Sequence, residues 1–303
     1  MSPSLSSRFW KFIIRKTYKD KRVTIAEIRA QDASAGKFMG RTPKDVEVEN
    51  ININGIDSAW IRPTGADKSK VLLHIHGGGY VTGSIASYLR MCILMAQTLK
   101  VNVLLPAYRL APEHPFPAAL DDVLKIYRWL LSQGYQSKDI LISGDSAGGG
   151  LCVASVLALR DQGDAVPAAV ICLSPWTDLT IQGQSHVTNV KSEAMLNTET
   201  LREWALAYTS EQNFRNPLVS PIFADFHNFP PLLIQVSADE VLLDDAVALA
   251  EKAKSAGVDV SLKVWDGLWH VWQVVGDAIP ESKKAFEEIG QFVRARFNGN
   301  LRT

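Results

Sequence analysis

Short apolar segments alternate with helix-like segments along most of this sequence. The strand-like segments are residues 46–53, 60–61, 71–75, 101–105, 139–143, 168–173, 232–236 and 258–264. The helix-like segments between or after them are residues 91–99, 118–131, 147–159, 246–256 and 282–296. Strands that are apolar on both faces and joined by helices form parallel sheets. The pattern therefore predicts an α/β fold, with a mostly parallel central sheet and helices on both of its faces.

Two regions depart from this alternation. Residues 1 to about 40 show helical apolar stripes, and residues of about 177 to 228 contain no core-type strand but one amphipathic helix, Thr198 to Tyr208. A segment that long between two core strands is an insertion domain or a lid. We therefore expect four parts: N-terminal helices (1–45), the first part of the core (46–176), a cap insertion (177–228) and the second part of the core (229–303).

Composition and charge exclude several classes of protein. The 303 residues are 47% hydrophobic and carry 32 basic and 32 acidic side chains, so nothing indicates attraction to nucleic acid or to an anionic membrane. Three cysteines, Cys92, Cys152 and Cys172, without a CxxC pattern indicate neither a disulfide framework nor a zinc site. No run approaches the ~20 apolar residues of a membrane span, and no signal peptide is present, so we expect a soluble, cytoplasmic protein.

The segment Gly144-Asp145-Ser146-Ala147-Gly148 matches the pattern G-x-S-x-G and lies between a predicted strand and a predicted helix. This context is the one in which the pattern forms a sharp turn that presents a nucleophilic serine. The helix that follows adds positive potential near a developing negative charge. The alternative is a glycine-rich turn with an accidental serine, and the strand–turn–helix context disfavours it. Ser146 is therefore the predicted nucleophile.

A second glycine-rich segment, from His76 to Tyr80, follows the strand at residues 71–75. Glycines let backbone N–H groups face a substrate, and two or three such donors stabilise an oxyanion by about 3 kcal/mol each. We predict Gly77, Gly78 and the amide of Ala147 as these donors. A phosphate loop is the alternative, but neither nucleotide-binding glycine pattern is present. His76 is expected to brace the loop, and His74 to lie in the core.

A serine of this kind needs a histidine base and an acid that orients it, in the chain order serine, acid, histidine. His270 follows the strand at 258–264, whereas His186 and His227 lie in the irregular insertion. His270 is therefore the predicted base. Asp239 is the first carboxylate after the strand at 232–236 and is the predicted acid. Three nearby acids compete with Asp239: Glu240, Asp244 and Asp245.

Together these residues resemble the bacterial hormone-sensitive-lipase-like esterases of the α/β-hydrolase superfamily. The resemblance rests on four segments: His76 to Tyr80, Pro106 to Ala119 (PAYRLAPEHPFPAA), Gly144 to Gly149, and Asp239 with His270. It implies a serine carboxylesterase that acts without cofactor or metal on short-chain acyl esters, under a cap built from the N-terminal helices and the insertion. The sequence departs from the family at Glu240-Val241, where Pro-Leu is frequent, and at Val271, where glycine is frequent.

Several functions share the same catalytic residues. An amidase, a thioesterase or a deacetylase stays open, as does a non-catalytic ligand-binding homologue, which His270 disfavours. The expected partner is a small-molecule ester, with no nucleic acid and no membrane insertion, and a homodimer stays open. Large apolar residues of the expected cap should shorten the pocket and favour acyl chains of about four to six carbons. They are Trp10, Phe12, Phe38, Met39, Trp204, Leu206 and Tyr208.

Overall fold

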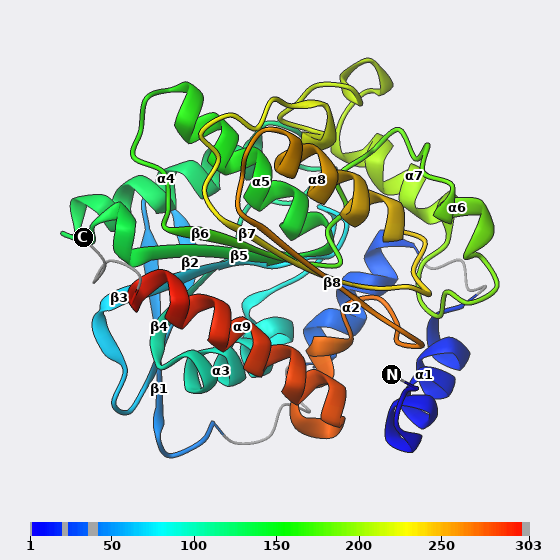
Figure 1. Ribbon diagram of the computed structural model, residues 1–303, viewed down its shortest axis with the longest axis horizontal. Coiled ribbons are helices and arrows are strands. Elements are labelled where there is room, and N and C mark those ends of the chain that lie inside the picture. The colour runs from blue at the N-terminus through cyan, green and yellow to red at the C-terminus, as the bar shows by residue number, and fades with distance from the viewer. Residues whose placement is uncertain (1, 20–23, 36–41, 299–303) are drawn as a thin grey trace.

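The computed structural model describes residues 2–19, 24–35 and 42–298, in which the strand-like segments form one eight-stranded sheet (Figure 1). Its order is β1-β2-β4-β3-β5-β6-β7-β8; β2 pairs antiparallel with both β1 and β4, and the other pairs are parallel. The strands are β1 Val46–Ile53, β2 Ile56–Pro63, β3 Asp67–Ile75, β4 Val101–Pro106, β5 Ile140–Asp145, β6 Ala169–Leu173, β7 Leu232–Ser237 and β8 Val260–Trp265. The predicted fold class, an α/β-hydrolase fold with a mostly parallel sheet, is confirmed.

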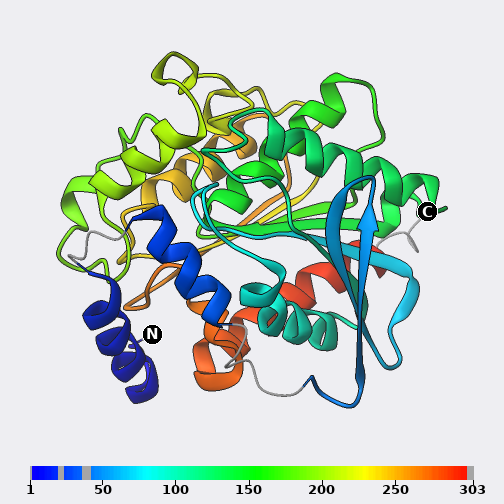
Figure 2. The ribbon, with the colours of Figure 1, turned by 180° about the vertical axis from the view of Figure 1, so that it is seen from behind.

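Helices cover both faces of the sheet, as Figures 1 and 2 show from opposite sides. One face carries α3 Ile85–Leu99 and α9 Pro280–Asn298; the other carries α4 Ala118–Ser132, α5 Ser146–Asp161 and α8 Leu243–Ser255. Successive strand residues point to opposite faces. In β3, Leu72 packs in the cluster under α3 and α9, whereas Val71 and Leu73 pack in the cluster under the other three helices. This explains why the inner strands are apolar throughout.

The two departing regions lie toward the same end of the molecule (Figures 1 and 2). The N-terminal helices are α1 Leu5–Tyr18 and α2 Ile25–Ala35, while Phe38 and Met39 lie outside the described residues. The insertion between β6 and β7 contains α6 Ser185–Thr188, the predicted helix α7 Thr198–Tyr208, and the 3-10 turns η3 Glu211–Asn213 and η4 Pro221–Phe223. Arg15 of α1 donates a hydrogen bond of 2.8 Å to the carbonyl of Lys191, which links the two regions directly.

The three cysteines are free and buried. Among the described residues, no helix is both long enough and apolar enough to cross a membrane. Two further 3-10 segments, η2 Ser137–Asp139 and η5 Trp272–Ala278, lie before β5 and after β8.

Candidate active site

Ser146 lies at the sharp turn between β5 and α5. Its backbone has φ = 53°, a left-handed conformation that costs a non-glycine residue about 1–3 kcal/mol. The turn is fixed by close packing, since a Cβ at Gly148 would overlap the carbonyl oxygen of Ile75 at the end of β3. The N–H of Trp176 also donates to the Ser146 carbonyl at 2.9 Å. The strained turn thus holds the serine, whose exposed fraction is 7%, at the carboxyl end of the sheet.

The glycine-rich loop after β3 does not use its N–H groups as the sequence suggested. The Gly77 N–H donates to Asp145 Oδ1 at 3.1 Å, so it is already occupied. Gly78 (φ = 105°) and Gly79 (φ = 62°) have left-handed backbones, and their N–H groups have no acceptor among the described residues. Ala147 is the second residue of α5, where backbone N–H groups have no partner within the helix. The geometry therefore speaks against Gly77 as an oxyanion donor and leaves Gly78, Gly79 and Ala147 free.

Asp145 is the residue before Ser146 in the G-x-S-x-G pattern. It joins the sharp turn at Ser146 to the glycine-rich loop. Besides the Gly77 N–H, it accepts the Tyr88 hydroxyl at 2.9 Å, and His74 Nε2 lies 3.4 Å from it. Burial, followed by the charge of Asp145, raises the pKa of Tyr88 well above its usual value, so the phenol stays a donor. This role could not be predicted from the sequence, because any residue can occupy that position of the motif.

His74 and His76 have the structural roles expected of them. His76 Nδ1 lies 2.8 Å from the Gly77 carbonyl, and its ring stacks on Tyr108 with centroids 4.2 Å apart. His74 is buried, and its side chain forms a hydrogen bond of 2.8 Å with Ser143 on β5, the neighbouring strand in the sheet. Burial lowers the pKa of His76, so its ring is neutral at pH 7. Both rings brace the strand ends.

The acid beside His270 is Glu240. His270 Nδ1 donates to Glu240 Oε2 at 2.8 Å, and both side chains are buried. The other carboxylate oxygen, Oε1, accepts the Ser237 N–H and the Ser174 hydroxyl, each at 2.7 Å. These three hydrogen bonds fix the carboxylate and, through it, the orientation of the imidazole.

The prediction of Asp239 as the orienting acid is therefore wrong. Residues 237–240 form a turn, closed by a hydrogen bond of 3.2 Å from the Glu240 N–H to the Ser237 carbonyl. This turn brings Glu240 back over the end of β7. Asp239 lies at the corner, where its side chain is 28% exposed and pairs with Lys11 of α1.

The buried pair alters the titration of its members. Burial alone would lower the pKa of His270, but the hydrogen bond and charge of Glu240, with the charges of Glu193 and Asp145, raise it above the ordinary value. Burial also raises the pKa of Glu240, against the lowering effect of His270. The acidic surroundings thus favour the imidazolium form of His270.

The remaining candidates have other partners. Asp244 accepts the Ser185 N–H at 2.8 Å. Asp245 accepts the backbone N–H groups of residues 177 and 178 and lies 3.6 Å from the buried His186. His227 is exposed and pairs with Asp225 at 2.7 Å. Both competing acids of α8 thus anchor the insertion to the core. Among the described residues, no group of three potential metal ligands occurs.

Comparison with known proteins agrees with this geometry. Residues 72–274 match a family model described as alpha/beta hydrolase fold. An acetyl-hydrolase of Streptomyces hygroscopicus is 40% identical over 278 residues, which cover 92% of this chain and 91% of that protein. A crystal structure of an esterase from the bacterial hormone-sensitive lipase family has 42% identity and a TM-score of 0.91, with 98% of this chain and 99% of that chain covered. The chain belongs to the bacterial hormone-sensitive lipase family of α/β-hydrolases.

A third relative is also closely similar. The esterase EstE5, whose crystals were soaked with p-nitrophenyl butyrate, has 37% identity and a TM-score of 0.91 over 97% of this chain and 99% of that chain. These similarities extend over almost the whole length of the chain, so they include the N-terminal helices and the insertion as well as the sheet.

Val271 follows His270, at the position where the resemblance led us to expect a glycine. Its backbone is left-handed, with φ = 50°, a strained conformation for a β-branched residue. The N–H of Val271 donates to Ser174 Oγ at 3.2 Å, and the same hydroxyl donates to Glu240. Ser174 therefore connects the acid to the backbone beside His270. Sequence reasoning missed it; the available signal was its place directly after the core strand β6.

Helix α2 and the insertion of this family member both contact residues 79–83, at the end of the glycine-rich loop and just after it. From α2, Asp32 Oδ2 accepts the Gly83 N–H at 2.7 Å and the Thr82 hydroxyl at 2.9 Å. From α7, the Trp204 ring packs so closely on Gly79 that a Cβ there would overlap it. The loop therefore has side chains from both regions against it.

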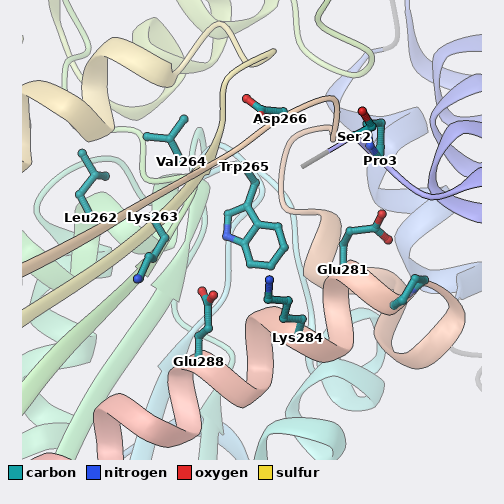
Figure 3. Close-up of a pocket in the computed structure, with 11 residues that line it drawn as sticks. Ser2, Pro3, Leu262, Lys263, Val264, Trp265, Asp266, Glu281, Lys284 and Glu288 are labelled. Atoms are coloured by element: carbon teal, nitrogen blue, oxygen red, sulfur yellow. The ribbon is translucent and has the colours of Figure 1, made fainter.

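The edge strand β8 of this hydrolase borders a separate pocket of about 500 Å³ (Figure 3). Trp265 and Lys284 lie at its centre, with Glu281 and Glu288 on α9 beside them. None of the residues that line it is Ser146, His270 or Glu240.

Proposed function

We propose that this chain is a serine carboxylesterase that hydrolyses short-chain acyl esters through an acyl-enzyme intermediate. The observation that carries the proposal is the buried His270–Glu240 hydrogen bond of 2.8 Å, at the sheet edge where the strained turn presents Ser146. With Nδ1 of His270 bound to the carboxylate, Nε2 is the nitrogen left to accept a proton from the serine hydroxyl.

In the first half of the reaction, Ser146 Oγ attacks the ester carbonyl carbon while His270 Nε2 takes the hydroxyl proton. The tetrahedral intermediate collapses as His270 returns that proton to the leaving alcohol, and an acyl-serine ester is formed. In the second half, His270 Nε2 takes a proton from water, which attacks the acyl carbon and forms a second tetrahedral intermediate. This intermediate collapses as His270 returns that proton to Ser146 Oγ, and the acid and free Ser146 are released. Glu240 stabilises the imidazolium in both halves and stays ionised.

The oxyanion would accept hydrogen bonds from Gly78, Gly79 and Ala147. The support is that the first two N–H groups have no acceptor among the described residues and that the third lies at the start of α5. Three preset donors aimed at one developing charge each contribute about 3 kcal/mol. Gly77 has a different part, because its N–H ties the loop to Asp145.

The N-terminal helices and the insertion would form the cap over this site. The support comes from their contacts with the loop: Asp32 of α2 holds residues 82 and 83, and Trp204 of α7 covers Gly79. An aromatic wall beside the oxyanion donors excludes water and limits the space for the acyl chain. The p-nitrophenyl butyrate used with the EstE5 relative is consistent with a short acyl group.

The test is hydrolysis of a series of p-nitrophenyl esters by the wild type and by Ser146→Ala. The kcat/KM of the wild type should be highest at about four to six acyl carbons, because each added methylene gains about 0.8 kcal/mol only while there is room to bury it. Ser146→Ala should lose activity by about 10⁶-fold. A maximum at about twelve carbons would contradict the short pocket, and near-normal turnover by Ser146→Ala would contradict the mechanism.

A further inference from the structure

Side chains of the insertion hold the backbone of the loop that carries Glu240. Asn189 Nδ2 donates to the carbonyls of Ala238 at 2.9 Å and Glu240 at 2.8 Å. The Ser192 hydroxyl lies 3.0 Å from the carbonyls of both Asp239 and Asn189, which share its one proton. Three successive carbonyls of the acid loop thus have side-chain partners from one short stretch of the insertion.

Glu193 adds a carboxylate to this set of contacts. Its Oε2 accepts the N–H of Val241, the residue after Glu240, at 3.0 Å. Its Oε1 accepts the N–H groups of Ala194 at 2.7 Å, Met195 at 2.8 Å and Leu196 at 3.3 Å. The side chain therefore joins a turn of the insertion to the backbone beside the acid.

The charge of Glu193 is not cancelled by a nearby cation. Its exposed fraction is 2%, and no lysine, arginine or histidine pairs with it in the part of the chain that the structure describes. Backbone N–H dipoles stabilise the carboxylate but leave its full charge to act on its neighbours. That charge raises the pKa of Glu240, which burial raises by a larger amount. It also raises the pKa of His270, on which burial has a larger and opposite effect.

Two other carboxylates of the described residues act on His270. Glu240 from the loop after β7 and Asp145 from the end of β5 act in the same direction as Glu193. Asp239 is paired with Lys11. In α8, the buried Asp245 faces His186. Glu193 is therefore the contribution of the insertion to the electrostatics of the base.

We propose that Glu193 is a positioning residue for the His270–Glu240 pair. It fixes the backbone beside Glu240, and its charge raises the pH at which His270 becomes an active base. The inference rests on the proposed function, because it assigns Glu193 a part in the serine hydrolase reaction. A purely structural role, in which Glu193 only closes the turn at 194–196, would not move the pH dependence.

Glu193→Gln removes the charge and keeps one acceptor oxygen, while the amide nitrogen in place of the other oxygen can no longer accept a backbone N–H. The pH dependence of the variant therefore reports on the charge. The acidic limb of kcat/KM should move to lower pH, since the imidazolium loses a stabilising negative charge and deprotonates more readily. The His270 imidazole signal in NMR, assigned with a His270→Gln variant, should titrate at correspondingly lower pH. The matched control is Glu211→Gln, which removes an exposed carboxylate of the insertion that pairs with Arg202; neither measurement should change. If folded Glu193→Gln keeps the wild-type acidic limb of kcat/KM and the wild-type titration of His270, the electrostatic part of the proposal is overturned.

Glu193→Asp makes the opposite change, because it keeps the charge and shortens the reach to Val241. We expect kcat to fall about tenfold, as the acid loop loses its fixed position, while the acidic limb stays in place. Wild-type kcat in Glu193→Asp would overturn the positioning part. If Glu193→Gln does not fold, as circular dichroism would show, Glu193→Asp still decides whether Glu193 is a positioning residue.

Failure of the proposed function would look different. A wild-type protein that hydrolyses no p-nitrophenyl ester contradicts the esterase assignment, whatever Glu193 does. The NMR titration of His270 needs no turnover, so it still tests whether the charge of Glu193 acts on the imidazole.

Discussion

Asp239 and Glu240 are adjacent in sequence but have opposite surroundings. Asp239 is partly exposed and pairs with Lys11, whereas Glu240 is fully buried and accepts three hydrogen bonds, one from His270. A carboxylate that orients a base must lie in fixed contact with it. At the scale of single residues, this difference supports Glu240 as the acid of the proposed reaction.

Glu240→Gln should therefore lower kcat by about 10⁴-fold. An amide at this position no longer selects the imidazole tautomer with a free Nε2, and it no longer stabilises the imidazolium. Asp239→Asn should change kcat less than about threefold, because it removes only a partly exposed ion pair. Steady-state kinetics of both variants on one p-nitrophenyl ester make the comparison. A larger loss in Asp239→Asn than in Glu240→Gln would restore Asp239 as the acid.

Sequence reasoning identified Ser146 and His270 as candidates but could not choose correctly between neighbouring acids. Position relative to a strand predicts which loop carries the acid, since the carboxyl ends of parallel strands meet at one edge. The direction of each side chain depends on the turn at 237–240, which only the folded backbone defines. The same limit applies to Gly77, whose N–H is taken by Asp145 from another strand.

At the scale of elements, α2 holds the loop that would form the oxyanion hole. Asp32 binds the backbone of Gly83 and the hydroxyl of Thr82. Arg29 Nε donates to the Val81 carbonyl at 2.7 Å, while its Nη1 and Nη2 pair with Glu113 at 2.8 Å. These contacts connect an N-terminal helix to two core loops.

Asp32→Ala should lower kcat about tenfold with little change in KM. The loop keeps its sequence but loses two of its anchors, and small displacements of oxyanion donors affect the transition state more than substrate binding. Asp45→Asn is a suitable control, because Asp45 binds Gln97 beside β1 and does not contact the loop. A rise in KM at unchanged kcat would show that α2 binds substrate and does not position the loop.

Trp204 on α7 should set the length of the acyl pocket, because its ring covers Gly79. Trp204→Ala removes a side chain that buries about 150–250 Å², so the preferred acyl chain should lengthen by several carbons. Leu206→Ala, two residues further along the same helix and 49% exposed, should leave the preference unchanged. The ester series measures both, and an unchanged optimum in Trp204→Ala would place the wall of the pocket elsewhere.

The sequence predicted most of these elements, because alternating apolar strands and amphipathic helices leave few ways to build an α/β core. It predicted the parallel strands and their covering helices with approximate bounds, and α7 with the bounds that the structure has. It did not give the short helix α6, since four residues are too few for a periodic pattern. The contacts of α2 and the insertion with the catalytic loops were also beyond it, because they join residues far apart in the chain.

At the scale of the whole molecule, a chain with no net charge concentrates acidic groups around one buried histidine. Three carboxylates from separate parts of the chain, Asp145, Glu193 and Glu240, act on His270. Burial opposes them, but the net effect is a raised pKa for the imidazole. Because the base must be neutral, activity should fall as pH drops through a midpoint above the ordinary imidazole value of about 6.5. A kcat/KM profile between about pH 5 and 9 measures this, and a midpoint below the ordinary value would contradict the acidic surroundings.

The most direct test of the account is the site at which a serine-directed phosphonate, such as a fluorophosphonate ester, attaches to the protein. Mass spectrometry of the intact chain and of its peptides should find one adduct, on Ser146. Its rate of formation should fall at low pH together with kcat/KM and should be strongly reduced in Glu240→Gln. An adduct on another residue, or none on a folded wild-type chain, would contradict the assignment of Ser146, His270 and Glu240 as the reacting group.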